Sequence, residues 1–563
     1  MIATLFLHPL GPALILALTS LLLELSRRWL MPPGTAPHRR HFAPQKAYLY
    51  QGLAAIGLLA AWGILVFLRL APPGAELRWP WQPLTVAGSV LAWQLDGWGW
   101  LASLLILLLA TTAFLLHVAG AGSQDAGHVG RTLLLAGAAL AFMAAHNVIT
   151  LASCWLALDA ALVLRLRPGH EREPAGRVWG LLSLASPLLL AVLLALGEKG
   201  SRATLSGGPF NWWELALLWV AALIRIGVYP LHLWLSSRSG LDTGERVAFH
   251  LIGPTAGFWL LGCVHEVAGP NWLGRPQWAA VAGLALLGSA LCAWAIEDER
   301  ARWQWIAINR TGLVLLAVSL GDAVGRQAVL WPMVTFSLGC ALLMAGLAAR
   351  ERWGWRAPAF LGALALWGIP GTAGFLARTA LVFPTQLSIA APLFGVLLVA
   401  ETLLVAALWQ AVWAGAPALA PGKREQGGRH AIERVALTAS LVVCALPLLF
   451  WGLLPGYLPA ELSSSTLPQV VASARRSTWV ALILSGLAGW GLGTRRGQIF
   501  RELRGWQQGI VAVASLEWLY RALAGLGALL ASGLRFLAAL GEGEGYLGWL
   551  ALVVLIIWVL VRG

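Results

Sequence analysis

Six ionisable side chains stand inside stretches of the sequence that are otherwise apolar. A charged side chain at the centre of a bilayer costs on the order of 2.5–3.5 kcal/mol, so such residues usually mark ion pathways. Carboxylates and imidazoles can take up and release protons, whereas guanidinium groups keep their positive charge. The six candidates for an ion pathway are Asp159, Arg225, His250, Arg310, Arg378 and Glu401. His232, two residues after a proline, is a seventh.

Two of these residues also have a structural interpretation. Asp159 lies about two helical turns from a basic segment, so it could pair with Arg165 or extend its carboxylate toward the membrane surface. His250 could be a hydrogen-bonding residue of the protein interior, the usual role of a lone membrane histidine. Both alternatives stay open at the level of the sequence.

For Arg225 and Arg378, function is favoured because each lies near a proline. Pro230 follows the first arginine and Pro370 precedes the second. A helix broken at such a point exposes backbone carbonyls to an ion or to water. The sequence therefore predicts broken helices at both places.

The composition predicts that helices in a membrane hold these residues in position. Of the 563 residues, 59% are hydrophobic and 11% are charged, against roughly 25% charged residues in a soluble domain. Apolar stretches of about 20 residues, enough to span a bilayer, recur along the whole chain. The net charge of +14 resides in short loops between them, which indicates membrane topology and not a nucleic-acid partner.

We count sixteen predicted spans, the first over 3–25 and the last over 545–561. An even number places both termini on one side. Basic residues concentrate in alternate loops, including 165–177, 350–356, 423–434 and 495–504. Because basic loops stay in the cytoplasm, both termini are predicted to face outward from the cell inner membrane. Segment 5–23 is expected to be a retained span, since it lacks the features of a signal peptide.

The five cysteines lie inside apolar runs, and their spacing suits neither zinc nor haem nor an iron–sulfur cluster. No dinucleotide-binding GxGxxG motif follows a predicted strand. We therefore expect no catalytic residue, metal or cofactor in this chain.

Segment 507–540 differs from the other long segments. It carries Glu517, Arg521 and Arg535 among leucines and alanines, a pattern typical of an amphipathic helix that lies along a membrane surface or a neighbouring subunit. Another spanning helix is the alternative interpretation.

Several motifs appear together in one order. Residues 225–235 read RIGVYPLHLWL, residues 298–312 read DERARWQWIAINRTG, and residues 368–378 read GIPGTAGFLAR. Asp96-Gly97 precedes the third span, and His250 is followed by Ala256-Gly257. In sequence and order these motifs resemble the antiporter-like, proton-translocating subunits of respiratory complex I, the Mrp antiporters and the membrane-bound hydrogenases. The resemblance extends over most of the chain.

The chain departs from this family at the residues that carry protons there. Leu156 stands where the family has a glutamate on its fifth helix, and Cys340 where it has a lysine. Arg225 and Arg378 replace the lysines of the seventh and twelfth helices. Arginine cannot release a proton at ordinary pH, so a relay would have to use other groups. The groups that can titrate are Asp159, His232, His250 and Glu401, with His146 at a junction between spans.

The resemblance implies an all-α, polytopic membrane fold of about sixteen helices. It contains two inverted repeats of five helices, each with a broken helix, and a C-terminal lateral helix. We accordingly predict N-terminal helices over 1–97, a first repeat over 98–250, a second over 251–412 and C-terminal helices over 413–563.

The resemblance also implies a proton- or cation-translocating membrane subunit of a complex I-type assembly, either an NADH:quinone oxidoreductase or a hydrogenase-like complex. Its partners would be other membrane subunits and the lipid bilayer. Two alternatives stay open because of the departures. The chain could be the membrane partner of an inorganic carbon uptake complex, which pairs with a carbonic-anhydrase-like protein, or a structural paralogue that no longer pumps.

Overall fold

The computed structural model describes most of the chain. The described residues are 7–30, 44–70, 76–80, 90–121, 127–165, 184–197, 203–235, 241–269, 276–320, 325–381, 390–413, 427–458, 467–541, 550, 553–554 and 557–558. Contacts divide the chain into two units, Met1–Glu502 and Leu503–Gly563, which we describe separately.

Long apolar helices dominate the first unit, as the composition predicts. Among the described residues, seven helices of the chain are long and apolar enough to cross a bilayer, and one bent pair in the second unit would make an eighth. The structure thus confirms a helical protein with several helices of membrane-spanning length. The count of sixteen stays a prediction, because expected spans such as 148–166 and 357–380 form short or broken helices.

The chain begins with two helices and a small β-hairpin. These elements are α2 (Gly11–Leu30), α3 (Pro44–Leu70), β1 (Glu76–Pro80) and β2 (Val90–Gln94). The strands pair antiparallel, with Glu76 opposite Gln94 and Pro80 opposite Val90. A bridge from Trp93 to Ala145 attaches the hairpin to the junction between two helices. The expectation of an all-α fold omitted this hairpin, whose two strands are five residues each.

The next helices hold the first group of candidate residues. They are α4 (Gly97–Leu116), η2 (His117–Ala121), α5 (Gly127–Met143), α6 (Val148–Arg165), α8 (Ala185–Leu196), α9 (Trp212–Ile226), α10 (Thr243–Val247), η4 (Ala248–Ile252) and α11 (Gly253–Ala268). Helix α9 ends at Gly227, whose φ of 73° is a left-handed conformation that favours glycine. Pro230 then keeps the chain from resuming the helix at once.

The second group of candidate residues lies on a further set of helices. They are α13 (Pro276–Ala295), α14 (Glu299–Ser319), α15 (Gln327–Val334), η5 (Thr335–Gly339), α16 (Cys340–Trp353), α17 (Ala357–Trp367), α18 (Ala373–Thr379) and α19 (Ala390–Trp413). Between α17 and α18 the chain breaks at Gly368 and Gly371, both at φ 88°, with Pro370 between them. This break lies where the GIPGTAGF motif places it.

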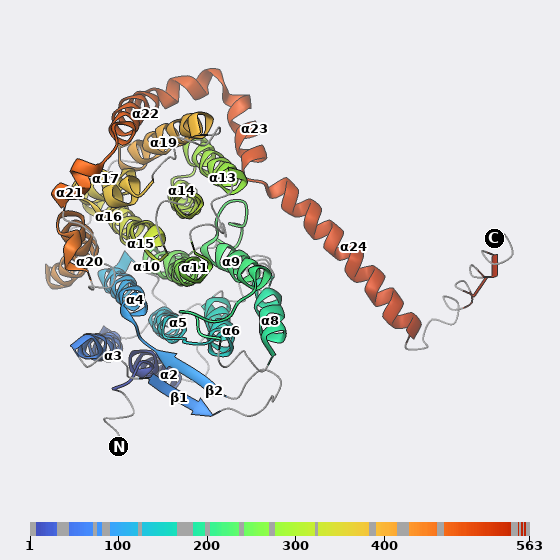
Figure 1. The fold of residues 1–563 in the computed structure, drawn as a ribbon. Helices are drawn as coiled ribbons and strands as arrows, with labels where there is room; N and C mark the ends of the chain where they lie inside the picture. Colours follow the sequence, from blue (N-terminus) through green and yellow to red (C-terminus); the bar gives the residue numbers. More distant parts are fainter. Residues whose placement is uncertain are drawn as a thin grey trace. The chain divides into compact units, whose positions relative to one another are not determined.

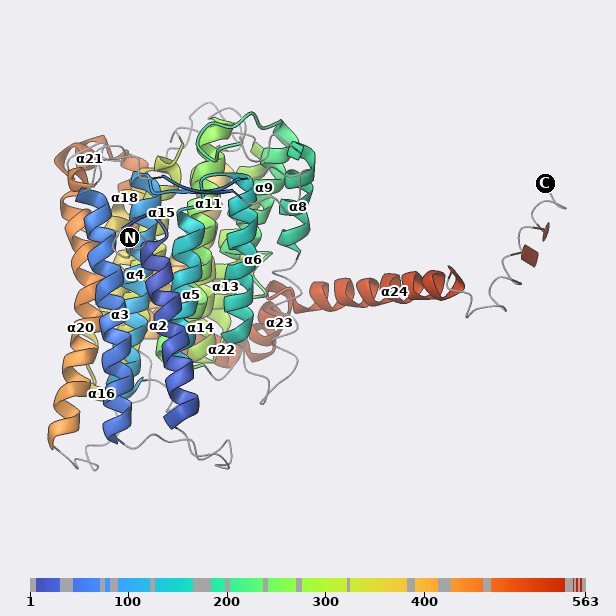
Figure 2. The ribbon, with the colours of Figure 1, turned by 90° about the horizontal axis from the view of Figure 1, so that it is seen from below.

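The remaining elements of the first unit are α20 (Gly427–Leu453), η6 (Pro455–Tyr457), α21 (Leu467–Ser473) and α22 (Arg476–Glu502). Figure 1 looks along the helices and shows α11 and α14 inside the bundle, with α2 and α3 toward one edge and α19 and α22 toward the opposite edge. Figure 2 shows that the long helices of this unit run side by side. Candidate residues on α6, α9, α14 and α19 can therefore face one another inside the bundle. The proposed repeat boundaries stay a prediction.

The second unit contains α23 (Arg504–Ala514) and α24 (Glu517–Gly541). The two helices meet at an angle of 43°, and Leu516 between them has a positive φ of 58°. On α24, Glu517, Arg521 and Arg535 share one face, because they are separated by multiples of about a helical turn. The predicted amphipathic segment 507–540 is therefore helical, and its lateral position stays a prediction.

The predicted topology leads to a labelling experiment. Much of the basic loops 165–177 and 423–434 lies outside the described residues, but Ser206 and Glu351 are both described and exposed. We expect Ser206→Cys, near the hairpin, to react with a membrane-impermeant maleimide on sealed cells, and Glu351→Cys only after permeabilisation. The five native cysteines are buried and should contribute little background. Labelling of Glu351→Cys on sealed cells would reverse the orientation.

Candidate functional site

The first charged cluster joins Asp159 of α6 to Arg225 of α9. Arg225 Nη1 lies 2.5 Å from Asp159 Oδ1. Arg225 is fully buried and Asp159 is 7% exposed. The Arg225 guanidinium also lies 3.9 Å from the centroid of the Trp155 ring, close enough for a cation–π interaction. The alternative partner proposed from the sequence, Arg165, has its side chain outside the described part of the chain.

This pair supplies an acidic partner for Arg225, although position 156 holds a leucine. Leu156 is 60% exposed, on the outer side of α6. Asp159 lies three residues further along the helix and is buried. The acidic partner of the α9 cation is thus present, but displaced along α6 from the position that the family motif indicates.

The second charged cluster consists of Arg310 on α14, Arg378 on α18 and Glu401 on α19. The two oxygens of Glu401 accept hydrogen bonds from Arg310 Nη2 at 2.8 Å and from Arg378 Nη2 at 2.7 Å. Arg310 also donates to the carbonyl of Leu366, at the end of α17, at 3.0 Å. All three charged residues are buried. One carboxylate therefore holds two cations beside the broken helix.

His232 is fully buried between aromatic rings. Its ring stacks on Tyr229 at 5.1 Å between centroids and tilts against Trp305 of α14 at 4.8 Å. Its Nδ1 lies 3.1 Å from the carbonyl oxygen of Pro230. The histidine is held in the segment that follows the end of α9.

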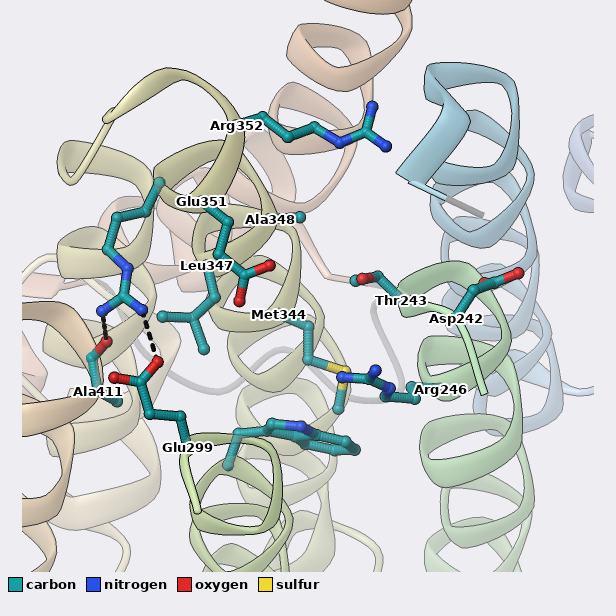
Figure 3. A pocket seen from close by; sticks show the side chains of 12 residues that line it. Asp242, Thr243, Arg246, Glu299, Met344, Leu347, Ala348, Glu351, Arg352 and Ala411 are labelled. Carbon is teal, nitrogen blue, oxygen red and sulfur yellow. Dashed lines mark hydrogen bonds and ion pairs between the residues drawn. The ribbon is translucent and has the colours of Figure 1, made fainter. Parts of the chain in front are cut away.

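His250 lies in the π-helical turn η4, and such turns occur often at functional sites. Its ring meets Trp303 of α14 edge to face at 5.0 Å between centroids. Trp303 also lines a cavity of about 230 Å³. Figure 3 shows Arg246, Glu299 and Arg352 around this cavity. A charged cavity therefore lies one aromatic ring away from His250.

In the sequence, Arg350 and Arg352 belong to a basic loop that indicates only membrane topology. Arg350 donates hydrogen bonds to Glu299, at 3.0 Å, and to the carbonyl of Ala411. Arg352 donates to the carbonyls at the end of η2. Counting the charges of a loop identifies neither these partners nor the cavity, because the partners come from distant parts of the chain.

Hydrogen bonds and close packing connect the elements that hold the two clusters. The hydroxyl of Thr311, next to Arg310, donates to the carbonyl of Ile308 at 2.7 Å and also lies 3.3 Å from the carbonyl oxygen of Gly227, just after the end of α9. A Cβ at Gly257 of α11 would lie 2.7 Å from the backbone nitrogen of Ile226, so α11 packs tightly on the same end of α9. The two clusters thus lie on elements in direct contact.

Three polar residues that the sequence analysis missed lie near these clusters. Asn309 accepts a hydrogen bond from Arg310 Nη2 at 2.6 Å. The hydroxyls of Thr255 and Ser337 lie 2.8 Å apart, between α11 and the π-helical turn η5. Uncharged residues of this kind are common in membrane helices, so their type alone did not distinguish them. For Asn309 the available signal was its place beside Arg310 in the 298–312 motif.

Close approach of backbones at the α17–α18 break leads to a mutational prediction. A Cβ at Gly374 would lie 1.8 Å from the carbonyl oxygen of Ala365. We expect Gly374→Ala to destabilise the protein by about 1–3 kcal/mol or more, because backbone atoms must move. Gly395→Ala is the matched control, since nothing lies within 4 Å of its Cβ position. Thermal unfolding of the two variants tests this, and equal midpoints would contradict the described break.

Comparison with solved structures identifies chains with a similar fold. A chain of the Mrp complex from Dietzia sp. aligns over 95% of this protein with a TM-score of 0.67 and 17% identity. A chain of respiratory complex I from Thermus thermophilus aligns over 83% with a TM-score of 0.61 and 21% identity, and 99% of that chain is covered. A chain of an archaeal membrane-bound sulfane sulfur reductase aligns over 84%, with 75% of that chain covered, a TM-score of 0.51 and 18% identity.

The protein covers 60% of the length of the Mrp chain. No protein-family model and no curated protein matches the sequence. The identities of 17% and 21% are low, so the comparison with these chains shows a shared fold. This protein therefore has the fold of membrane chains from the Mrp complex and complex I, in agreement with the antiporter-like subunit family that its motifs resemble.

Proposed function

We propose that this chain is an antiporter-like membrane subunit that moves protons or other cations within a larger complex of the complex I type. The observation that carries the proposal is the pair of buried charged clusters, one at the end of α9 and one beside the α17–α18 break. Buried ion pairs at broken helices are characteristic of transport pathways. The similar fold of chains from the Mrp complex and from respiratory complex I supports the same assignment.

In this proposal the arginines set the local charge, and other groups carry the proton. Arg225 cannot deprotonate, so a proton arriving at the first cluster would bind to Asp159. The buried Arg225 would then lose its counter-charge, and its electrostatic energy would rise steeply. Proton arrival is thereby coupled to movement of Arg225 or to the arrival of another charge. Protonation of Glu401 would likewise leave Arg310 and Arg378 without their counter-charge.

The cavity beside Trp303 would supply a route by which water reaches the titratable residues. It lies among charged residues of α10, α14 and α16, at the end of the bundle that we predict to be cytoplasmic. His250 would exchange protons with this cavity through bound water, since an imidazole can both bind and release a proton. The proposed path connects His250 with Asp159 and Glu401 through bound water.

The second unit supports the proposal of membrane partners. Helix α24 exposes Trp518 and six further large apolar side chains, a surface that needs either lipid or another protein to cover it. The six are Leu523, Leu526, Leu529, Leu530, Leu534 and Phe536. We propose that this helix lies along a neighbouring membrane subunit, and a structure of the complex with α24 crossing the bilayer would refute it.

Ion flux in proteoliposomes of the whole complex tests the proposed function. With an imposed pH gradient, the wild-type complex should dissipate the gradient faster than protein-free liposomes, as reported by an entrapped pH-sensitive dye. Replacing the dominant cation in the buffer would show whether protons alone are moved. Absence of any flux would reject translocation and leave the partner or structural role.

The absence of the family's usual lysines favours both alternatives, the inorganic carbon uptake partner and the structural paralogue, and the first of them can be tested directly. Arg225, Cys340 and Arg378 stand at three lysine positions, so a relay by lysine deprotonation is excluded. Purification of the tagged complex from its native membrane distinguishes the two assignments. Recovery of redox or antiporter subunits supports the first proposal, and recovery of one large zinc-site protein supports the second.

A further inference from the structure

The two charged clusters differ in their balance of charge. The first contains one carboxylate and one guanidinium, Asp159 and Arg225. The second contains one carboxylate, Glu401, between two guanidinium groups, Arg310 and Arg378. An excess positive charge is costly inside a membrane protein, and arginine cannot remove it by losing a proton. The second cluster therefore calls for one more negative charge.

Two polar atoms at this cluster indicate where that negative charge would bind. Arg378 Nη1 and Thr335 Oγ1 are buried, and neither has a hydrogen-bond partner among the residues that the structure describes. The Arg378 side chain is 10% exposed and Thr335 is 2% exposed. A buried donor without an acceptor costs about 1–3 kcal/mol. Both residues line the same small cavity beside Glu401.

This cavity has the size and surroundings that suit a small ion. Its volume is about 30 Å³, above the roughly 10–15 Å³ that one water molecule needs. Ser477 and Thr478 also line it, at the start of the 27-residue helix α22. The N-terminus of a helix carries a partial positive charge and favours an anion. A hydroxyl, a guanidinium N–H and a helix N-terminus therefore converge on one space.

We propose that this cavity binds one small monovalent anion of the size of chloride. The anion accepts hydrogen bonds from Arg378 Nη1 and Thr335 Oγ1, and it brings the charge of the second cluster to zero. Water would satisfy the two donors but would leave the excess charge. The inference rests on this geometry and goes beyond the proposed cation transport, since anion binding can be measured in a protein that moves no ions.

Chloride binding can be measured on the purified full-length protein in detergent. Gluconate replaces chloride at constant ionic strength, because gluconate is too large for a cavity of about 30 Å³. We expect the thermal unfolding midpoint to rise with chloride concentration and to saturate, as for a ligand that binds only the folded state. Equal midpoints in chloride and gluconate at every concentration would overturn the proposal.

Two variants assign the effect to this cavity. Thr335→Val keeps every charge and removes one hydrogen bond to the anion, so the chloride concentration at half-maximal shift should rise about 10- to 100-fold. Arg378→Gln removes the excess charge and should abolish the shift. If Arg378→Gln does not fold, the chloride concentration at half-maximal shift in Thr335→Val is the measurement that tests the site.

Thr112→Val is the matched control, a buried threonine on α4 whose hydroxyl donates to the carbonyl of Leu108 and lies 3.1 Å from Cys444 Sγ on α20. It should respond to chloride as the wild type does. An unchanged half-maximal concentration in Thr335→Val, or an equal change in Thr112→Val, would show that the anion binds elsewhere and would overturn the site.

Discussion

Replacing Asp159 by asparagine is expected to destabilise the bundle by about 3–5 kcal/mol, the usual cost of removing one partner from a buried ion pair. The reason is Arg225, which is fully buried and paired with Asp159 at 2.5 Å. Asparagine is nearly the same size as aspartate, so the loss would be one of charge and not of packing. Thermal unfolding of the purified protein measures the effect.

A double variant separates the loss of the pair from the burial of an unpaired charge. Asp159→Leu combined with Arg225→Met replaces both charges with apolar groups, a change that is often neutral or stabilising for a buried pair. We expect the double variant to be more stable than Asp159→Asn. Glu76→Gln serves as the surface control, because its partner Arg78 is 70% exposed and the pair should contribute little. A single variant as stable as the double would contradict the described pair.

Much of this site could be predicted from the sequence, because placing a charged residue in an apolar span costs free energy and such residues are therefore rare. Arg225, Arg310, Arg378 and Glu401 all lie in the two clusters. The prolines and glycines of two motifs also indicated where helices break. These signals are local, so a single sequence contains them.

The partners could not be predicted, because they depend on how distant helices pack. Glu401 binds Arg310, which lies 91 residues away. For Asp159 the sequence indicates Arg165 or the membrane surface, and it gives no sign of Arg225. The motif directed attention to Leu156, whereas the buried acid lies three residues further along α6. Which side of a helix is buried depends on its neighbours, and an apolar span gives little sign of it.

Uncharged polar residues were the hardest to recognise. Thr335 draws no attention as one threonine in an apolar stretch, and it becomes informative only because its hydroxyl is buried beside Arg378. The cavity near Trp303 was missed for a related reason. In the sequence its arginines indicate only membrane topology, and only the structure shows that they surround one cavity.

We propose that protons cross this subunit by way of titratable residues next to the arginine clusters. Ion flux through proteoliposomes containing the His250→Ala/Glu401→Gln double variant of the whole complex tests it most directly. We expect flux to fall to the level of protein-free liposomes, because both variants remove a group that can bind a proton. The amount of assembled complex must be measured in parallel, since Glu401→Gln also leaves Arg310 and Arg378 without their carboxylate.

The matched control is His8→Ala combined with Glu76→Gln, which removes one histidine and one glutamate away from the two clusters. This control should retain wild-type flux. We expect loss of flux in the His250→Ala/Glu401→Gln complex at a normal level of assembly, and wild-type flux in that complex would rule out the proposed proton path.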